Sequence, residues 1–101
     1  MKFLLLTLLL LSKPVKEHSV TLTWIDSINP PTTTYNVYKY NGKCSPTTLF
    51  LNRINSSPII SKTYIDTNII AGSSYCYGVS SYLNGVESEK TMGVDAVIPK
   101  P

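Results

Sequence analysis

The sequence has little of the chemistry on which enzyme active sites depend. Among its 101 residues there is one histidine, His18, and only six residues are acidic. No serine or cysteine nucleophile stands in a recognisable sequence context with that histidine. There is also no glycine-rich phosphate loop, no EF-hand pattern and no Arg-Gly-Asp tripeptide. We therefore predict a protein that is not an enzyme and needs no cofactor, since catalysis would require a cleft that brings two carboxylates together.

Long runs of one charge and long apolar runs are also missing. The formal net charge of +3 and the pI near 8.9 come from lysines and arginines scattered along the chain. Scattered charges do not focus a field on a phosphate backbone, so the sequence predicts no nucleic-acid partner. The longest apolar run has about nine residues where a membrane span needs about twenty, so we expect no span.

That apolar run lies in the N-terminal segment, residues 1–12, which reads MKFLLLTLLLLS. A lysine, an apolar run and then polar residues are the outline of a secretory signal peptide. The cleavage site is weak, because small residues are preferred one and three places before the cut and Ser12 follows Leu10 and Leu11. The alternative is a retained hydrophobic strand or anchor that buries its leucines against a partner. In either case residues 13–101 are expected to form one domain.

After residue 14 the sequence changes to the pattern of short β-strands. In HSVTLTW, residues 18–24, apolar and polar residues alternate, which predicts a strand with one buried face. Further strands are predicted at 35–40, 49–55, 62–66 and 75–83 and at the C-terminal end, separated by Asn, Gly and Pro turn signals. About seven short strands at this spacing indicate an all-β protein, a seven-stranded antiparallel β-sandwich. The inward positions of the first two strands predict a core that contains Val20, Leu22, Trp24, Tyr35 and Val37.

Together these segments resemble a fibronectin type III domain of the bacterial or phage type, which has an immunoglobulin-like topology. The resemblance rests on HSVTLTW, YNVYK, INSSPI, TYIDTNIIAGSSYCYGVSSYLNGVES and AVIP, and it covers nearly everything from Lys16 to Pro99. The core tryptophan of this family lies on the second strand, which matches Trp24, whereas antibody-type domains carry theirs on the third strand. The resemblance implies a sandwich of fibronectin type III topology.

The family also has a tyrosine corner, which matches Ile69, Ala71, Gly72 and Tyr75. By this resemblance the ring of Tyr75 packs inward and its hydroxyl bonds to upstream backbone. Alternation along the strand then places two more residues in the core and turns the residues between them to the other face. The additional core residues are Tyr77 and Val79, and the residues on the other face are Cys76, Gly78 and Ser80.

The two cysteines, Cys44 and Cys76, are brought close together by the topology that the resemblance implies. With an export signal, they point to an oxidising compartment and one disulfide bond, which leaves Cys76 outside the core. The alternative is two free thiols in a cytoplasmic or virion protein. A metal site is not expected, because two cysteines without neighbouring His or Cys ligands cannot complete a tetrahedral zinc site.

Two surfaces are candidates for recognition. The first is a face formed by Tyr38, Tyr40 and Tyr82, because exposed tyrosines offer broad contact area at low entropic cost. The alternative for Tyr38 is structural, with its ring covering the bare backbone at Gly78. The second candidate is the loop pair at residues 26–34 and 83–88, since loops held by a sandwich commonly carry binding sites.

The resemblance implies a secreted or extracellular, non-enzymatic binding or spacer module, used for adhesion or for contact with a protein or carbohydrate partner. Exposure on a cell surface or a virion surface fits the same expectation. The alternative is a structural subunit of an extracellular filament, a surface layer or a phage particle. In that case residues 1–12 would mediate self-association as an inter-subunit strand.

Overall fold

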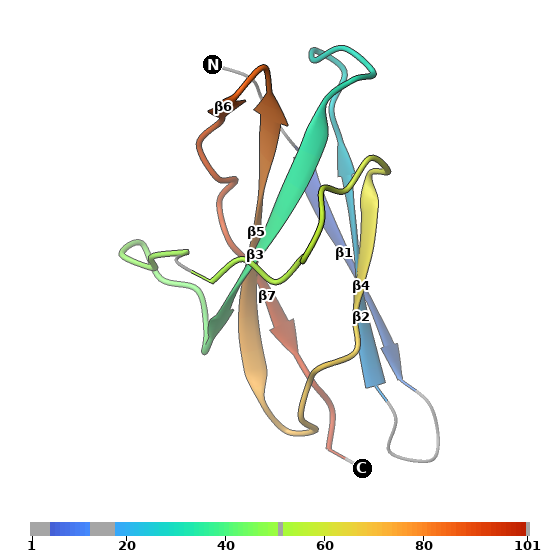
Figure 1. Ribbon diagram of the computed structural model, residues 1–101. Helices are drawn as coiled ribbons and strands as arrows, with labels where there is room; N and C mark the ends of the chain where they lie inside the picture. The colour runs from blue at the N-terminus through green and yellow to red at the C-terminus, as the bar shows by residue number, and fades with distance from the viewer. Residues whose placement is uncertain (1–4, 13–17, 51, 101) are drawn as a thin grey trace.

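The structure, a computed structural model, describes residues 5–12, 18–50 and 52–100. Figure 1 shows these residues as an elongated body whose C-terminus lies at one end. Within them the chain forms seven β-strands and no helix, and so no helix able to cross a membrane. The strands are β1 (Leu5–Ser12), β2 (His18–Ile25), β3 (Thr34–Asn41), β4 (Thr63–Asp66), β5 (Ser74–Leu83), β6 (Val86–Glu87) and β7 (Val94–Val97).

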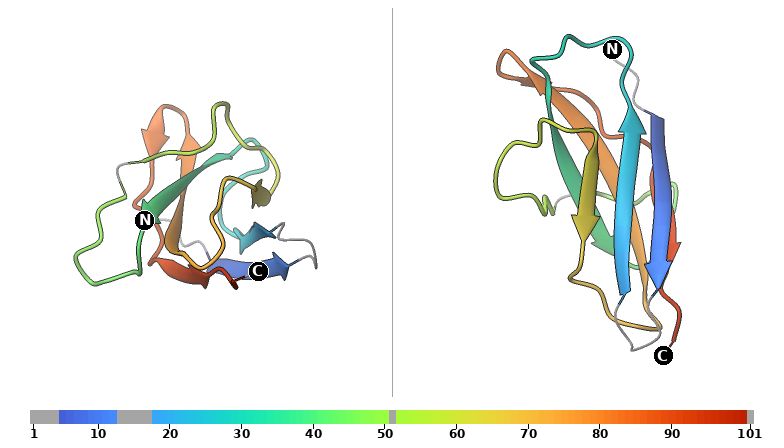
Figure 2. Two further views of the ribbon diagram at one scale, coloured as in Figure 1. Left: turned by 90° about the horizontal axis from the view of Figure 1, so that it is seen from below. Right: turned by 90° about the vertical axis from the view of Figure 1, so that its right-hand side faces the viewer.

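The strands form two sheets that face each other, as the view along the body shows (Figure 2). The first sheet has the strand order β1-β2-β4, and the second has the order β3-β5-β6, with β7 also paired to β5. Every one of these pairings is antiparallel. The predicted all-β sandwich is therefore confirmed.

The core lies between the two sheets and follows the period-two pattern of the strands. Trp24 of β2 and Tyr35 of β3 meet edge to face across the sandwich, with ring centroids 5.4 Å apart. Such an aromatic pair contributes about 0.5–1.5 kcal/mol beyond the area that it buries. All seven residues expected in the core belong to the buried cluster, which consists of Val20, Leu22, Trp24, Tyr35, Val37, Tyr75, Tyr77, Val79, Ala96 and Ile98.

The backbone of β1 pairs with β2 over its whole length, from Leu5 opposite Ile25 to Ser12 opposite His18. In the structure, most of the apolar N-terminal segment is thus a strand beside β2 of the same chain. β1 lies at one edge of the first sheet. Residues 1–4 of this segment, and residues 13–17 at its expected boundary, lie outside the described residues.

The prediction of a strand at residues 49–55 is wrong. The described residues of this segment, which exclude Leu51, form no strand and make only an isolated bridge between Arg53 and Tyr38. The segment runs beside β3, and its main chain bonds twice to that strand, from Lys39 N to Asn52 O at 3.0 Å and from Ile54 N to Val37 O at 2.9 Å. The next ladder bond is missing because a side chain takes its place.

That side chain belongs to Asn55, which is 5% exposed. Its Oδ1 accepts the hydrogen bond of Val37 N at 2.8 Å, and its Nδ2 donates to Asn36 Oδ1 and to Ser57 O at 3.1 and 3.0 Å. The amide thus satisfies a buried backbone donor and holds the turn that follows. Asn55 also begins the glycosylation sequence Asn-Ser-Ser, but a folded domain does not present this buried nitrogen for modification.

We expect Asn55→Ala to lower the free energy of unfolding by about 1–3 kcal/mol, because Val37 N–H would be buried without an acceptor. Urea denaturation monitored by the fluorescence of Trp24 measures this loss. Asn52→Ala is the matched control, because the side chain of Asn52 is exposed, and it should change stability by less than about 0.5 kcal/mol. Equal effects of the two substitutions would contradict the bonding role of the Asn55 amide.

Candidate functional site

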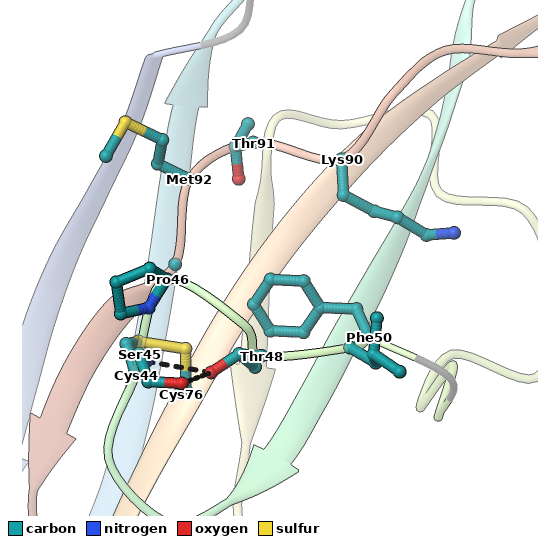
Figure 3. A pocket seen from close by; sticks show the side chains of 11 residues that line it. Cys44, Ser45, Pro46, Thr48, Phe50, Cys76, Lys90, Thr91 and Met92 are labelled. Atoms are coloured by element: carbon teal, nitrogen blue, oxygen red, sulfur yellow. Dashed lines mark hydrogen bonds between the residues drawn. A yellow bond between two sulfur atoms is a disulfide. The ribbon is translucent and has the colours of Figure 1, made fainter.

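A disulfide bond joins Cys44, which follows β3, to Cys76 of β5. The two sulfur atoms are 1.99 Å apart and the Cα atoms are 5.0 Å apart. Figure 3 shows the bridge beneath the segment that Cys44 begins. The backbone N–H of Cys44 also donates to Asp95 Oδ1 of β7 at 2.6 Å. Cys44, Cys76 and Asp95 are close enough to suggest metal ligands, but joined sulfurs offer no thiolate.

Cys76 lies on the face of the second sheet that points away from the core, yet it is fully buried. Two segments, 44–50 and 90–93, lie over this face, and we call them the cover. They line a groove of about 410 Å³ around the disulfide. At Gly93 the approach is so close that an added Cβ would lie 2.6 Å from Cys44 Sγ. Cys76 is not part of the buried cluster between the sheets, and above it lies the cover rather than solvent.

The bare backbone at Gly78 is covered by Phe50 rather than by Tyr38. A Cβ added to Gly78 would lie 2.8 Å from Cε2 of the Phe50 ring. Tyr38 lies opposite Gly78 in the β3–β5 register, but the phenylalanine occupies the space above the glycine. The alternative expectation, that the ring of Tyr38 covers Gly78, is therefore wrong, because the ring above Gly78 is that of Phe50.

The candidate face of three tyrosines is also corrected, because the structure separates them. Tyr38 is only 8% exposed, with its hydroxyl donating to Glu87 Oε2 at 2.5 Å and Lys90 Nζ 4.6 Å from its ring centroid. Tyr40 and Tyr82 are exposed, at 43% and 44%. They lie opposite Cys76 and Thr34, positions about 20 Å apart along the strands at about 3.3 Å per residue. Alternation placed the three on one side of the sheet but could not show the cover between them.

Glu87 holds the covered face together through hydrogen bonds. Its Oε2 accepts from the hydroxyls of Tyr38 and Ser80, and more distantly from the amide of Asn36. Burial raises the pKa of the Glu87 carboxyl, but the hydrogen bonds from Ser80 and Tyr38 outweigh it and hold the pKa below its usual range. The negatively charged form is thus the one that fits the fold.

A buried ion pair connects the two sheets near the C-terminal end of β3. Lys39 Nζ lies 2.9 Å from Asp66 Oδ2 at the end of β4, and both side chains are less than a tenth exposed. The same carboxylate oxygen accepts a bond of 2.5 Å from the hydroxyl of Tyr77, and Lys39 also donates to Asn68 O. Burial, reinforced by the bond to Asp66, raises the pKa of Tyr77.

The tyrosine corner residues lie beside this ion pair. Tyr75 is 6% exposed, its hydroxyl oxygen accepts the hydrogen bond of Ile70 N at 3.0 Å, and Lys39 Nζ lies 4.4 Å from its ring centroid. Ile69 packs against the core. Gly72 has φ +82, a left-handed conformation that suits glycine, and its N–H donates to Ile98 O at 3.0 Å.

The second candidate, the loop pair, lies at the end of the body opposite the C-terminus (Figures 1 and 2). We call residues 26–33 and 84–86 the loop end. Asp26 Oδ1 accepts from the backbone N–H groups of Ile28 and Asn29 at 3.2 and 3.1 Å, which fixes the first loop. Asn84 and Gly85 form the second turn with φ values of 53 and 80. Ile28 on the first loop is 50% exposed, and Val86, the first residue of β6 after the second turn, is 69% exposed.

Hydrogen bonds from Asn29 and from a tyrosine beneath the loop end keep Asp26 charged. The hydroxyl of Tyr35 donates to Asp26 Oδ2 at 2.9 Å. Burial raises the pKa of Asp26, but hydrogen bonds from Asn29 and Tyr35 outweigh it and lower the pKa overall. Burial and the bond to Asp26 raise the pKa of Tyr35 to about 12. This carboxylate therefore serves the structure of the loop.

Comparison with solved structures identifies the fold. Over 93% of its length the chain is similar to the solution structure of a fourth fibronectin type III domain from human, of which 76% is covered, with a TM-score of 0.65 and 17% identity. Over 94% it is similar to the crystal structure of an Fn3-like protein from Clostridium thermocellum, of which 88% is covered, with a TM-score of 0.59 and 26% identity. No protein-family model matches the chain, and no curated protein sequence does. The solved structures confirm the fibronectin type III fold that the sequence resembles.

Removing the disulfide should destabilise the domain, because the bridge closes a loop with a sequence separation of 32. We expect the double substitution Cys44→Ser with Cys76→Ser to cost about 3–4 kcal/mol in urea denaturation. Adding dithiothreitol should destabilise the wild type by a similar amount and leave the double variant unchanged. Two alkylatable thiols in the untreated wild type, found by intact mass, would contradict the bridge.

Acidification should weaken the domain through Glu87. Because its pKa is lower in the folded state, the carboxylate contributes stability that is present above its ordinary pKa of 4.5 and is lost as the pH falls through the lowered folded value. The free energy of unfolding should therefore fall more steeply with acid in the wild type than in Glu87→Gln, from about pH 6 to about pH 2. Parallel curves for the two proteins would show that the hydrogen bonds to Glu87 do not lower its pKa in the folded state.

Proposed function

We propose that this chain, which has the fibronectin type III fold, is an extracellular binding module without catalytic activity. Fibronectin type III domains are typically non-enzymatic modules. The buried carboxylates of this chain support the same conclusion, because Asp26 and Asp66 each accept a bond from a tyrosine hydroxyl and from a backbone N–H. These groups stabilise turns and strand ends.

The extracellular location is supported by the disulfide and by the N-terminal sequence. A bridge between Cys44 and Cys76 is stable in an oxidising compartment and would be reduced in most cytoplasms. Residues 1–12 have the outline of a signal peptide, and Leu5–Ser12 of this segment form the strand beside β2. Export and the bridge thus point to the same compartment.

The observation that carries the binding role is the loop end. Its two loops are fixed by the Asp26 hydrogen bonds and by the turn at Asn84 and Gly85, and they present Ile28 and Val86 to solvent. Apolar side chains on rigid loops bind without a large loss of conformational entropy. We propose that these two side chains contact a protein partner on the surface of cells.

Replacing both side chains by serine, in Ile28→Ser with Val86→Ser, should abolish retention of the fluorescently labelled domain on intact cells of the producing culture. Loss of a buried aliphatic contact at each position accounts for the effect. Ile70→Ser is the matched control, because Ile70 is also exposed, at 69%, but lies in the β4–β5 connection at the other end of the body (Figure 1).

The control variant should be retained like the wild type, and circular dichroism should show that both variants are folded. Equal retention of the double variant and the wild type would overturn the role of the loop end. Wild-type retention no higher than that of an unrelated fibronectin type III domain would overturn the binding role.

A further inference from the structure

A furrow lies away from the loop end, where the last residues of β3 and β4 meet the cover segment 44–50 and Asn52. It consists of two adjoining cavities of about 540 and 380 Å³, which share Lys39, Asn41 and Asn52 in their linings. The first cavity is also lined by Tyr40 and the second by Asn68. We call these residues the amide furrow, because three of the five are asparagines.

The three asparagine side chains are exposed, and none makes a side-chain hydrogen bond to another described residue. This separates them from Asn29, Asn36 and Asn55, whose amides are all bonded within the chain. Each free amide offers two donors and one acceptor. The amide furrow therefore presents several neighbouring hydrogen-bonding groups that the fold does not use.

The backbones that carry these amides are fixed. Asn41 pairs with Tyr75 in the β3–β5 register. Asn52 O accepts from Lys39 N at 3.0 Å. Asn68 is held on both sides, because its N–H donates to Asp66 Oδ1 and its carbonyl accepts from Lys39 Nζ. Since the amides start from fixed positions, a ligand would pay little to order them.

Tyr40 provides an aromatic surface beside the amides. An edge of its ring packs on the backbone of Gly42, where an added Cβ would lie 3.0 Å from Cε2. Gly42 has φ +136, which favours glycine, so the backbone can approach the ring this closely. The ring is 43% exposed, so part of it is available for stacking against a flat partner.

The charges of the furrow select the class of ligand. Lys39 is the charged group common to both cavities, and Asp66 neutralises it at 2.9 Å. A phosphate or carboxylate would therefore find no free cation in the described lining. An apolar ligand would leave the exposed amides without water, which costs free energy. A neutral, hydroxyl-rich ring with an apolar face satisfies both the amides and the tyrosine.

We propose that the amide furrow binds a neutral polysaccharide chain, with one pyranose ring stacked on Tyr40 and neighbouring hydroxyls bonded to Asn41, Asn52 and Asn68. The hydroxyls accept from the amide nitrogens and donate to the amide oxygens. This site is separate from the loop end, so the domain would hold a glycan at one end and a protein at the other. The saccharide proposal does not depend on the loop-end contact.

The test is an NMR titration of the full-length, ¹⁵N-labelled chain with four neutral probes: cellohexaose, xylohexaose, chitohexaose and mannohexaose. At least one probe should shift backbone amide signals of the furrow and leave those of residues 26–33 in place. Tyr40→Ala should weaken this binding at least about tenfold, which equals about 1.4 kcal/mol. Asn52→Ala should weaken it as well, because one bonding amide is removed.

Tyr82→Ala is the matched control. Tyr82 is 44% exposed and lies near the C-terminal end of β5, opposite Thr34 at the start of β3, whereas Tyr40 lies near the end of β3. It should bind the probe like the wild type, and the dispersion of the spectrum shows whether each variant is folded. No shift with any of the four probes, up to their solubility limits, would overturn the proposal. Shifts outside the furrow, or equal losses in Tyr40→Ala and Tyr82→Ala, would overturn it too. Cell retention through Ile28 and Val86 is measured independently, so the failure of one proposal leaves the other standing.

Discussion

The structure depends on the burial of strand β5 on both of its faces. In a two-sheet sandwich each strand has one face toward the core, and the other usually faces water. Here Tyr75, Tyr77 and Val79 fill the core, while Cys76 and Ser80 on the opposite face are fully buried as well. The cover that buries the second face is a partial third layer. The disulfide ties segment 44–50 to β5, and hydrogen bonds between Thr91 and Val79 tie segment 90–93 to the same strand.

Two glycines, Gly78 of β5 and Gly93 of the cover, follow from the same constraint. Gly78 leaves room for the Phe50 ring and Gly93 leaves room for the disulfide. A side chain at Gly78 would force the Phe50 ring to move, and one at Gly93 would force the disulfide to move. Glu87 stabilises the same outer face with hydrogen bonds, because its carboxylate accepts from the hydroxyls of Tyr38 and Ser80. Covalent, steric and polar contacts thus act on one small face, and each depends on the others being in place.

The sequence predicted those features that depend on alternation within one strand. Period two identified β2 and β3 and the core positions on them. On β5 the core positions Tyr77 and Val79 followed by alternation only after the resemblance had placed Tyr75 inward. The sequence could not predict the cover, because alternation tells which side of a sheet a residue is on and not what lies above it. Tyr38 was misjudged for this reason. The strand expected at 49–55 failed for another, since the side chain of Asn55 replaces a backbone acceptor, and an asparagine in a loop-like sequence carries no signal for that.

The cover also limits which surfaces are open to solvent. Because it lies over Cys76 and Gly78 on the outer face of the second sheet, that face is not a continuous exposed surface, and both surfaces that we propose for binding lie toward the ends of the strands. The ends differ in chemistry. At the loop end Asp26 and the hairpin turn hold aliphatic side chains in water, where a protein surface can bury them. At the other end the ion pair of Lys39 and Asp66 costs desolvation, which its contacts with Tyr77 and Asn68 offset. The positive charge of Lys39 and the negative charge of Asp66 cancel, so the lining of the furrow has no net charge from this pair. Three asparagine amides without a side-chain bond to another described residue lie in the same lining. We therefore expect the furrow to suit hydroxyl groups better than anions or hydrocarbon.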